Sequence, residues 1–118
     1  MKLIKLYEDV NYGYKKGELF EFVKDDGNKT YFINYEGKED FFNTVFRGNT
    51  YSVIDATPED RLKYGILHLS YILGIDTKEV AEDIKEYEKD KLAEMFVTFK
   101  DMAVKNYERK LIELVTKD

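Results

Sequence analysis

A histidine and a serine lie close together near the middle of the chain, and nucleophilic catalysis needs such a pair. His68 is the only histidine, and Ser70 is one of two serines. A serine nucleophile requires an imidazole that faces its hydroxyl. On a helix, two residues that are two positions apart point about 200° away from each other. We therefore expect His68 to lie beside an apolar helix stripe and to have no catalytic role.

Four carboxylates fall within two turns of a predicted helix, and lysines are interleaved with them. Carboxylate oxygens are ligands for hard cations such as Mg²⁺. Alternating acids and lysines are also typical of a solvated, ion-paired helix face. We expect the ion-paired face and no metal site. The four acids are Glu79, Glu82, Asp83 and Glu86.

A second carboxylate arrangement has the residue types of a metal-dependent nuclease. Asp26 precedes the tripeptide 36–38, which begins with a glutamate and ends with a lysine. In such nucleases two acids hold Mg²⁺ and a lysine assists the attacking water. Here both pieces fall on predicted turns, where Asp, Glu, Gly and Lys are common for conformational reasons. The pattern therefore gives little support to catalysis.

Composition excludes most other chemistry. The chain has no cysteine, which excludes disulfides, thiolate catalysis, cysteine-ligated zinc and iron–sulfur clusters. Its glycines are isolated, and neither a phosphate-binding loop nor a Gly-x-Gly-x-x-Gly motif is present. We expect a protein that is not an enzyme and has no cofactor.

Length and charge limit the class of protein further. The chain has 118 residues, which is the size of one domain, and we expect residues 1–118 to form a single one. It carries 24 acidic and 19 basic side chains, and this acidic excess disfavours binding to the nucleic-acid backbone. The start shows no signal peptide, and no apolar run reaches membrane-spanning length. We expect a cytoplasmic protein that does not bind membranes.

Aromatic residues divide the chain into a β-rich part, 1–56, and a helical part, 57–118. The first part holds 12 of the 18 tyrosines and phenylalanines, in short runs that are separated by Gly, Asn and Asp. These runs predict an antiparallel meander of about five short strands, as a curled sheet or an SH3-like small barrel, with a long loop at 8–17. The fold class is α+β. The predicted strands are 2–7, 18–24, 29–35, 39–46 and 51–54.

Three helices are expected in the second part. Thr57 is a predicted N-cap, Pro58 stands at the first helical position, and Gly74 is the predicted end of the first helix. A second capping signal follows at 76–79. The apolar spacing then jumps after residue 87, which predicts either a break or one long helix with a new packing partner. An unbroken helix from 77 to 116 would be about 60 Å long, so we favour the break.

The last predicted helix has an apolar face that is too wide for one small sheet to cover. Three residues, Val97, Val104 and Ile112, lie off its main face. A helix that is apolar on more than one face is buried between layers or pairs with another chain. We therefore expect a protein partner or a homo-oligomer formed through this helix. The main-face residues are Leu92, Met95, Phe96, Phe99, Met102, Ala103, Leu111 and Leu114.

Tyrosines of the β-rich part supply a second set of candidate contacts. Twelve aromatic residues are more than a small sheet is expected to bury, and tyrosine is favoured at binding surfaces. Tyrosine also stacks on single-stranded nucleic acid, for which Lys15, Lys16 and Lys29 would supply positive charge. Candidate partner-binding residues are Tyr12, Tyr14, Tyr31, Tyr35 and Tyr51 from the sheet, and Val97, Val104, Tyr107 and Ile112 from the last helix.

Exclusion and surface patterns together predict a non-catalytic protein-interaction module. We expect a small inhibitor or adaptor of a larger machine, because no catalytic constellation is present and two surfaces are suited to binding. The residue bias is common in small proteins of AT-rich bacterial genomes and their phages, so a phage or host machine is the expected setting. The alternative is a nucleic-acid-binding small β-barrel protein that uses tyrosine stacking.

Overall fold

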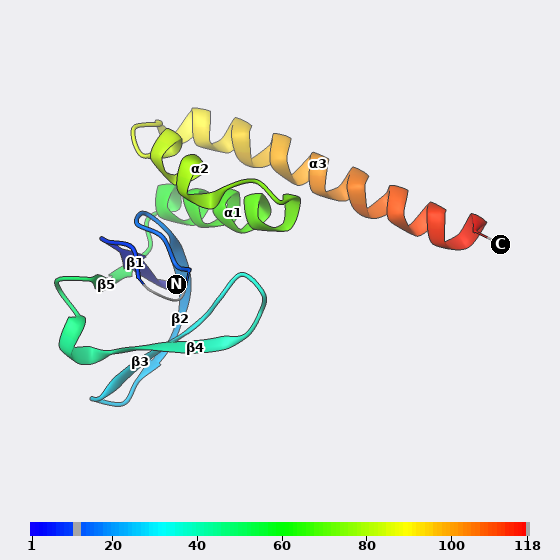
Figure 1. Ribbon diagram of the computed structural model, residues 1–118. Helices are drawn as coiled ribbons and strands as arrows, with labels where there is room; N and C mark the ends of the chain where they lie inside the picture. The colour runs from blue at the N-terminus through cyan, green and yellow to red at the C-terminus, as the bar shows by residue number, and fades with distance from the viewer. Residues whose placement is uncertain (11–12, 118) are drawn as a thin grey trace.

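The computed structural model describes residues 1–10 and 13–117 and shows an α+β fold (Figure 1). A five-stranded antiparallel sheet is followed by three helices, as the sequence predicts. A short 3₁₀ helix, η1, lies between the last two strands. The elements are β1 Lys2–Leu6, β2 Leu19–Asp25, β3 Lys29–Ile33, β4 Glu39–Asn43, η1 Thr44–Phe46, β5 Tyr51–Asp55, α1 Pro58–Leu73, α2 Thr77–Ile84 and α3 Lys89–Thr116.

The sheet is open, and its strand order is β4-β3-β2-β1-β5. The first four strands form the predicted meander. The fifth strand crosses to the other edge and pairs antiparallel with β1, where Leu3 lies opposite Ile54. Within the described residues β4 and β5 do not pair with each other, so the structure has the curled sheet and not the closed barrel.

Turn chemistry explains where two predicted strands end early. The strand predicted over 29–35 ends at Ile33, because the Asn34 side chain accepts hydrogen bonds from the backbone N–H groups of Glu36 and Lys38. Such bonds compete with the sheet ladder. The strand predicted over 39–46 ends at Asn43, because the chain turns into η1 at Thr44.

The centre of the sheet is covered on both faces. Leu3 and Ile4 are neighbours on the central strand β1, so their side chains point to opposite faces, and both are completely buried. A group of aromatic rings, Phe20, Phe32 and Phe42, packs together within the curl of the sheet. Tyr14, from the loop after β1, lies edge-on to all three rings.

Both ends of α1 are formed by the residues that the sequence indicates. Asp60 N–H donates to Thr57 Oγ1 over 3.1 Å, and Thr57 N–H donates to Asp60 Oδ2 over 3.0 Å, which is a complete capping box. Gly74 ends the helix with φ of 76°, in the left-handed region. At α2 the Asp76 carboxylate accepts from two backbone N–H groups. The return bond from Glu79 is not formed.

The predicted break between the last two helices is confirmed. Helix α2 ends at Ile84 and α3 begins at Lys89. Helix α1 lies between the sheet and the first half of α3 (Figure 1). The two helices approach closely at Gly65, where an added Cβ would lie only 2.6 Å from Cε2 of Phe96.

Helix α3 is by far the longest element. Its 28 residues correspond to about 42 Å. Charged side chains recur along it, and no helix in the described part of the chain is both long enough and apolar enough to cross a membrane. The length of α3 exceeds that of α1, so the two helices cannot cover each other fully.

Candidate functional site

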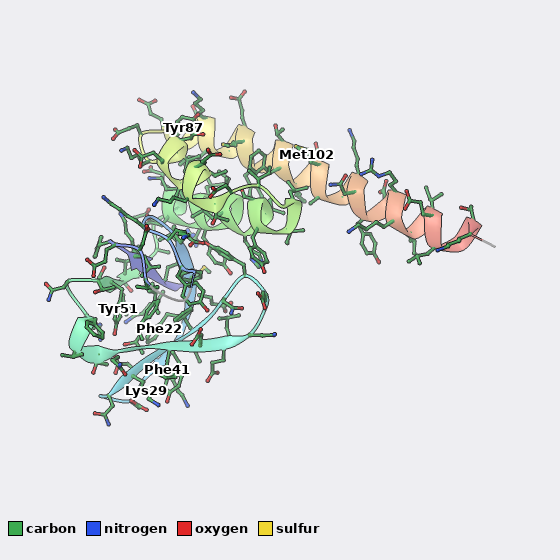
Figure 2. All side chains as sticks on the ribbon, in the orientation of Figure 1. Phe22, Lys29, Phe41, Tyr51, Tyr87 and Met102 are labelled. Atoms are coloured by element: carbon green, nitrogen blue, oxygen red, sulfur yellow. The ribbon has the colours of Figure 1, made fainter. Side chains whose placement is uncertain are left out.

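The C-terminal half of α3 extends beyond α1, away from the rest of the molecule (Figure 1). We call residues 104–116 the arm. Met102 is labelled in Figure 2 and stands just before it, where the side chain is already 43% exposed. Every residue from Tyr107 to Thr116 is exposed. The helix simply continues past the end of its packing partner.

Five large apolar side chains form an exposed stripe on the arm, which we call the arm stripe. At 100° per residue they fall within an arc of about 100°. The centre of this arc is rotated by about 80° from the face that Leu92, Phe96 and Phe99 pack against the core. The arm stripe consists of Val104, 46% exposed, Tyr107, 67%, Leu111, 49%, Leu114, 73%, and Val115, 77%.

Little holds the arm in place apart from its own backbone hydrogen bonds. Its side-chain hydrogen bonds are local, from Arg109 to Asn106 over 3.0 Å and from Thr116 to the carbonyl of Ile112 over 2.8 Å. None of the four ion pairs among residues 1–10 and 13–117 involves α3. Isolated helices of about this length are marginal in water. A partner that covers the arm stripe would therefore stabilise the helical conformation of the arm.

Four of the predicted contact residues are exposed on α3, as expected. Val97, Val104, Tyr107 and Ile112 all show at least 46% of their surface. The sequence analysis assigned Met102, Leu111 and Leu114 to the main apolar face of this helix and did not name them as candidate contacts. All three are exposed, because α1 does not reach this part of α3. Their spacing showed an apolar face, but no pattern in the sequence showed where α1 would stop.

Two of the predicted surface tyrosines are core residues. Tyr35 is 7% exposed and Tyr51 is completely buried, so their assignment to a partner-binding surface is wrong. Tyr35 donates to the carbonyl of Leu19 over 2.8 Å, and the Tyr51 hydroxyl lies 2.6 Å from Oγ1 of Thr30. The curl of the sheet encloses more aromatic surface than a flat sheet of five strands would. Tyr12 lies outside the described residues.

Tyr14 and Tyr31 are half-buried and each donates to an aspartate. The Tyr14 hydroxyl donates to Asp40 over 2.6 Å, and burial together with this carboxylate raises the pKa of Tyr14 to about 12. The Tyr31 hydroxyl donates to Asp26 over 3.2 Å. Both hydroxyls therefore stay protonated near neutral pH, as fixed donors within the sheet part.

The three lysines of the nucleic-acid alternative belong to two regions. Lys15 and Lys16 lie in the loop between β1 and β2, which faces α2. The backbone N–H of Lys16 donates there to Asp9 over 2.8 Å. Lys29 lies instead on the β3–β4 hairpin, with its ammonium 4.2 Å from the centre of the Phe41 ring. The structure does not gather them into one basic patch.

The residues with catalytic potential have structural surroundings. His68 lies against the rings of Tyr35 and Tyr64, and the Ser70 hydroxyl donates to the carbonyl of Ile66 over 2.7 Å. Asp26 and the 36–38 tripeptide occupy turns at opposite ends of β3. In the described part of the chain no three His, Asp or Glu residues are grouped closely enough to hold a metal ion.

A hollow of 650 Å³ lies between the loop after β1 and the β4–η1 segment, and we call it the loop–β4 groove. Phe41, 41% exposed, and Phe46, 51% exposed, contribute apolar surface to it. Glu8, Asp9 and Asp40 contribute carboxylates. The sequence analysis did not find this groove, because its walls come from segments that are about 30 residues apart.

A second hollow, of 510 Å³, lies where the β-rich part meets the junction of α1 and α2. Its most buried polar residue is Glu18, which is 3% exposed. The Glu18 carboxylate accepts from the backbone N–H of Lys15 and from the Thr77 hydroxyl, the latter over 3.1 Å. Burial raises the pKa of Glu18. These bonds attach the loop to the first turn of α2.

The arm stripe and the loop–β4 groove are thus two candidate binding surfaces in the described part of the chain. The arm is apolar and projects, whereas the groove is aromatic and concave. The exposed rings of Phe41 and Phe46 are not core residues, whereas Tyr14 and Phe42, which also line the groove, pack against the core. Searches for similar proteins give no further guide, because no protein-family model, curated protein or solved structure matches the chain.

Proposed function

We propose that this chain is a non-catalytic protein-interaction module whose binding element is the arm. The observation that carries the proposal is the arm stripe, which is exposed and has nothing to pack on among the described residues. One common mode of recognition places the apolar face of a helix in a groove of another protein, with anchors three, four and seven residues apart. Val104, Tyr107, Leu111 and Leu114 have this spacing.

Charge indicates the chemistry of the groove that the arm fits. The arm, residues 104–116, carries three basic and two acidic side chains, whereas the whole chain carries 19 and 24. An apolar groove with an acidic rim would therefore attract the arm and would be repelled by the rest of the molecule. When the arm is docked, the acidic remainder of the molecule lies beside the partner's groove. A small inhibitor or adaptor of a larger assembly would act in this way.

The test compares matched variants of the full chain as affinity baits in lysate. Leu111→Asp places a charge in the arm stripe, and Ile72→Asp makes the same change at an apolar side chain of α1 that is 60% exposed. We expect one protein to be retained by wild type and Ile72→Asp and lost with Leu111→Asp. With that protein purified, Leu111→Asp should weaken binding at least tenfold. Equal capture by all three baits contradicts the proposal, provided that circular dichroism shows the variants folded.

A second candidate, binding of single-stranded nucleic acid, is favoured by one cluster on the sheet. The Tyr31 and Phe41 rings lie 6.0 Å apart, with the ammonium of Lys24 4.9 Å from the Tyr31 ring and that of Lys29 4.2 Å from the Phe41 ring. Aromatic faces with lysines beside them are stacking platforms. A labelled oligonucleotide should then bind at low salt and be released as salt rises. An unchanged signal at low salt removes this candidate.

A further inference from the structure

The loop–β4 groove has the two properties that the arm requires of a partner. The exposed rings of Phe41 and Phe46 give it an apolar surface, and the rings of Tyr14 and Phe42 lie between them and the core. Its 650 Å³ is within the usual range of small-molecule binding clefts. No basic residue is among the described residues that line it.

Two carboxylates at this groove have no ion-pair partner among residues 1–10 and 13–117. Glu8 accepts a hydrogen bond from the Thr50 hydroxyl over 2.6 Å, and Asp40 accepts one from the Tyr14 hydroxyl over 2.6 Å. The third carboxylate, Asp9, is paired with Lys78 over 2.8 Å. Glu8 and Asp40 therefore have acceptor capacity to spare, because an ionised carboxylate has about four acceptor positions.

The basic side chains of the arm are the matching half. Lys105, Arg109 and Lys110 make no ion pair within the described part of the chain. Lys110 is adjacent to Leu111 and one turn after Tyr107, so its ammonium flanks the arm stripe. The arm thus offers Lys110 beside exposed apolar side chains, with Glu108 at the opposite edge of the stripe, and the groove offers Glu8 and Asp40 beside exposed rings.

We propose that the arm of one copy of this chain docks in the loop–β4 groove of a second copy. The inference rests on the proposed function, in which the arm is the docking element, and it names one occupant. Tyr107 and Leu111 pack on Phe41 and Phe46, and Lys110 lies near Glu8. The arm belongs to one continuous helix that leads away from the sheet, so it cannot reach the groove of its own chain (Figure 1).

Pairing of two arms with each other gains less from charge than docking of an arm in the groove. Each arm carries three basic and two acidic side chains, whereas the described lining of the groove carries three carboxylates and no basic side chain. Two copies that exchange arms form a closed dimer with two equal contacts. A one-way contact would instead continue from copy to copy as an open chain.

Sedimentation of the full chain over a range of concentration and salt tests the proposal. We expect wild type to self-associate at low salt and to dissociate as salt rises. Lys110→Glu on the arm and Glu8→Lys at the groove should each weaken association at least tenfold when alone. A mixture of these two variants should associate again, because the reversed arm of one meets the reversed groove of the other. Lys89→Glu, at the far end of α3, is the matched control and should behave as wild type.

Three results would overturn the inference. The first is a wild-type chain that stays monomeric at all concentrations at low salt. The second is association that survives both Leu111→Asp and Lys110→Glu. The third is a mixture of the reversed variants that remains monomeric although Glu8→Gln, which keeps the hydrogen bond from Thr50, has wild-type stability. The proposed function fails separately, because it requires only that Leu111→Asp loses the captured partner while Ile72→Asp retains it.

Discussion

The two halves of α3 have similar apolar content and very different surroundings. In the first half Leu92 is completely buried, and Phe96 and Phe99 pack against the core. In the second half Leu111 and Leu114 are exposed. The difference arises from the length of α1, which accompanies only the first half (Figure 1). Apolar residues at helical spacing thus show that a face is suited to burial, but not whether this chain supplies the cover.

The largest expected effect tests this contrast directly with two leucines of the same helix. Leu92→Ala should lower the free energy of unfolding by about 2–5 kcal/mol, because it leaves a cavity in the core. Leu111→Ala should change it by no more than about 0.5 kcal/mol, because the side chain is half exposed and the arm has no cover. Urea titrations of dilute protein measure both. Similar costs for the two substitutions would show that the arm is covered within the monomer.

The next effect concerns the close approach that fixes the first half of α3 on α1. Gly65→Ala should destabilise the protein by about 1–3 kcal/mol, because the new methyl group would overlap the Phe96 ring. Alanine in an exposed helix position would instead stabilise by about 1 kcal/mol. Adding Phe96→Leu should make the alanine less costly than it is in the wild-type background. A stabilising Gly65→Ala would mean that the helices separate easily.

A pair of threonines gives a smaller contrast between α1 and the arm. Thr57→Ala removes the cap of α1, on which the first half of α3 packs, and should cost about 1 kcal/mol. Thr116→Ala removes a hydroxyl at the exposed end of the arm and should cost almost nothing. Thermal unfolding of the two variants compares them. A larger cost for Thr116→Ala would place the arm within the cooperative unit.

The smallest effect tests a contact that involves neither half of α3, and it depends on pH. Burial raises the pKa of Glu18 above its ordinary value of 4.5, so the folded state holds the proton more tightly than the unfolded state. The ionised Glu18 carboxylate therefore lowers the free energy of unfolding. This cost is fully present well above the raised pKa and is absent below the ordinary value of 4.5. Glu18→Gln should slightly raise the melting temperature near neutral pH, and the gain should vanish in acid. A lower melting temperature for Glu18→Gln both near neutral pH and in acid would show that the bonds to Lys15 and Thr77 matter more than the charge.

The local signals in the sequence were reliable wherever one segment decides its own structure. The cap at Thr57, the left-handed Gly74 and the break before Lys89 all depend on neighbouring residues, and each is present. The pairing of β5 with β1 depends instead on strands that are about 50 residues apart. No local pattern distinguishes that edge from the edge at β4, so the predicted meander was correct only for four strands.

Burial of the tyrosines was harder to predict than their secondary structure. Tyr51 and Tyr31 are both strand residues, but one is completely buried and the other half-buried. Their burial depends on the curvature of the sheet, which brings the Phe42 ring against Tyr51, whereas Tyr31 lies on the other face. Curvature arises from the whole set of strand pairings. An apolar face on α3 suited to binding could be predicted from the sequence, because it depends on spacing along one helix. The extent of its exposure could not, because that depends on where α1 ends.

The crossing of β5 to β1 has a consequence for the order of folding. Lys2 lies opposite Asp55, and the backbone N–H of Ala56 donates to the carbonyl of Met1 over 2.9 Å. During synthesis β1 must therefore wait for more than 50 later residues before its second edge is paired. Non-local pairings of this kind slow folding, because the entropy of loop closure is lost before contacts form. We expect closure of the β1–β5 edge to limit the folding rate, and the helices to form earlier and dock when it is complete.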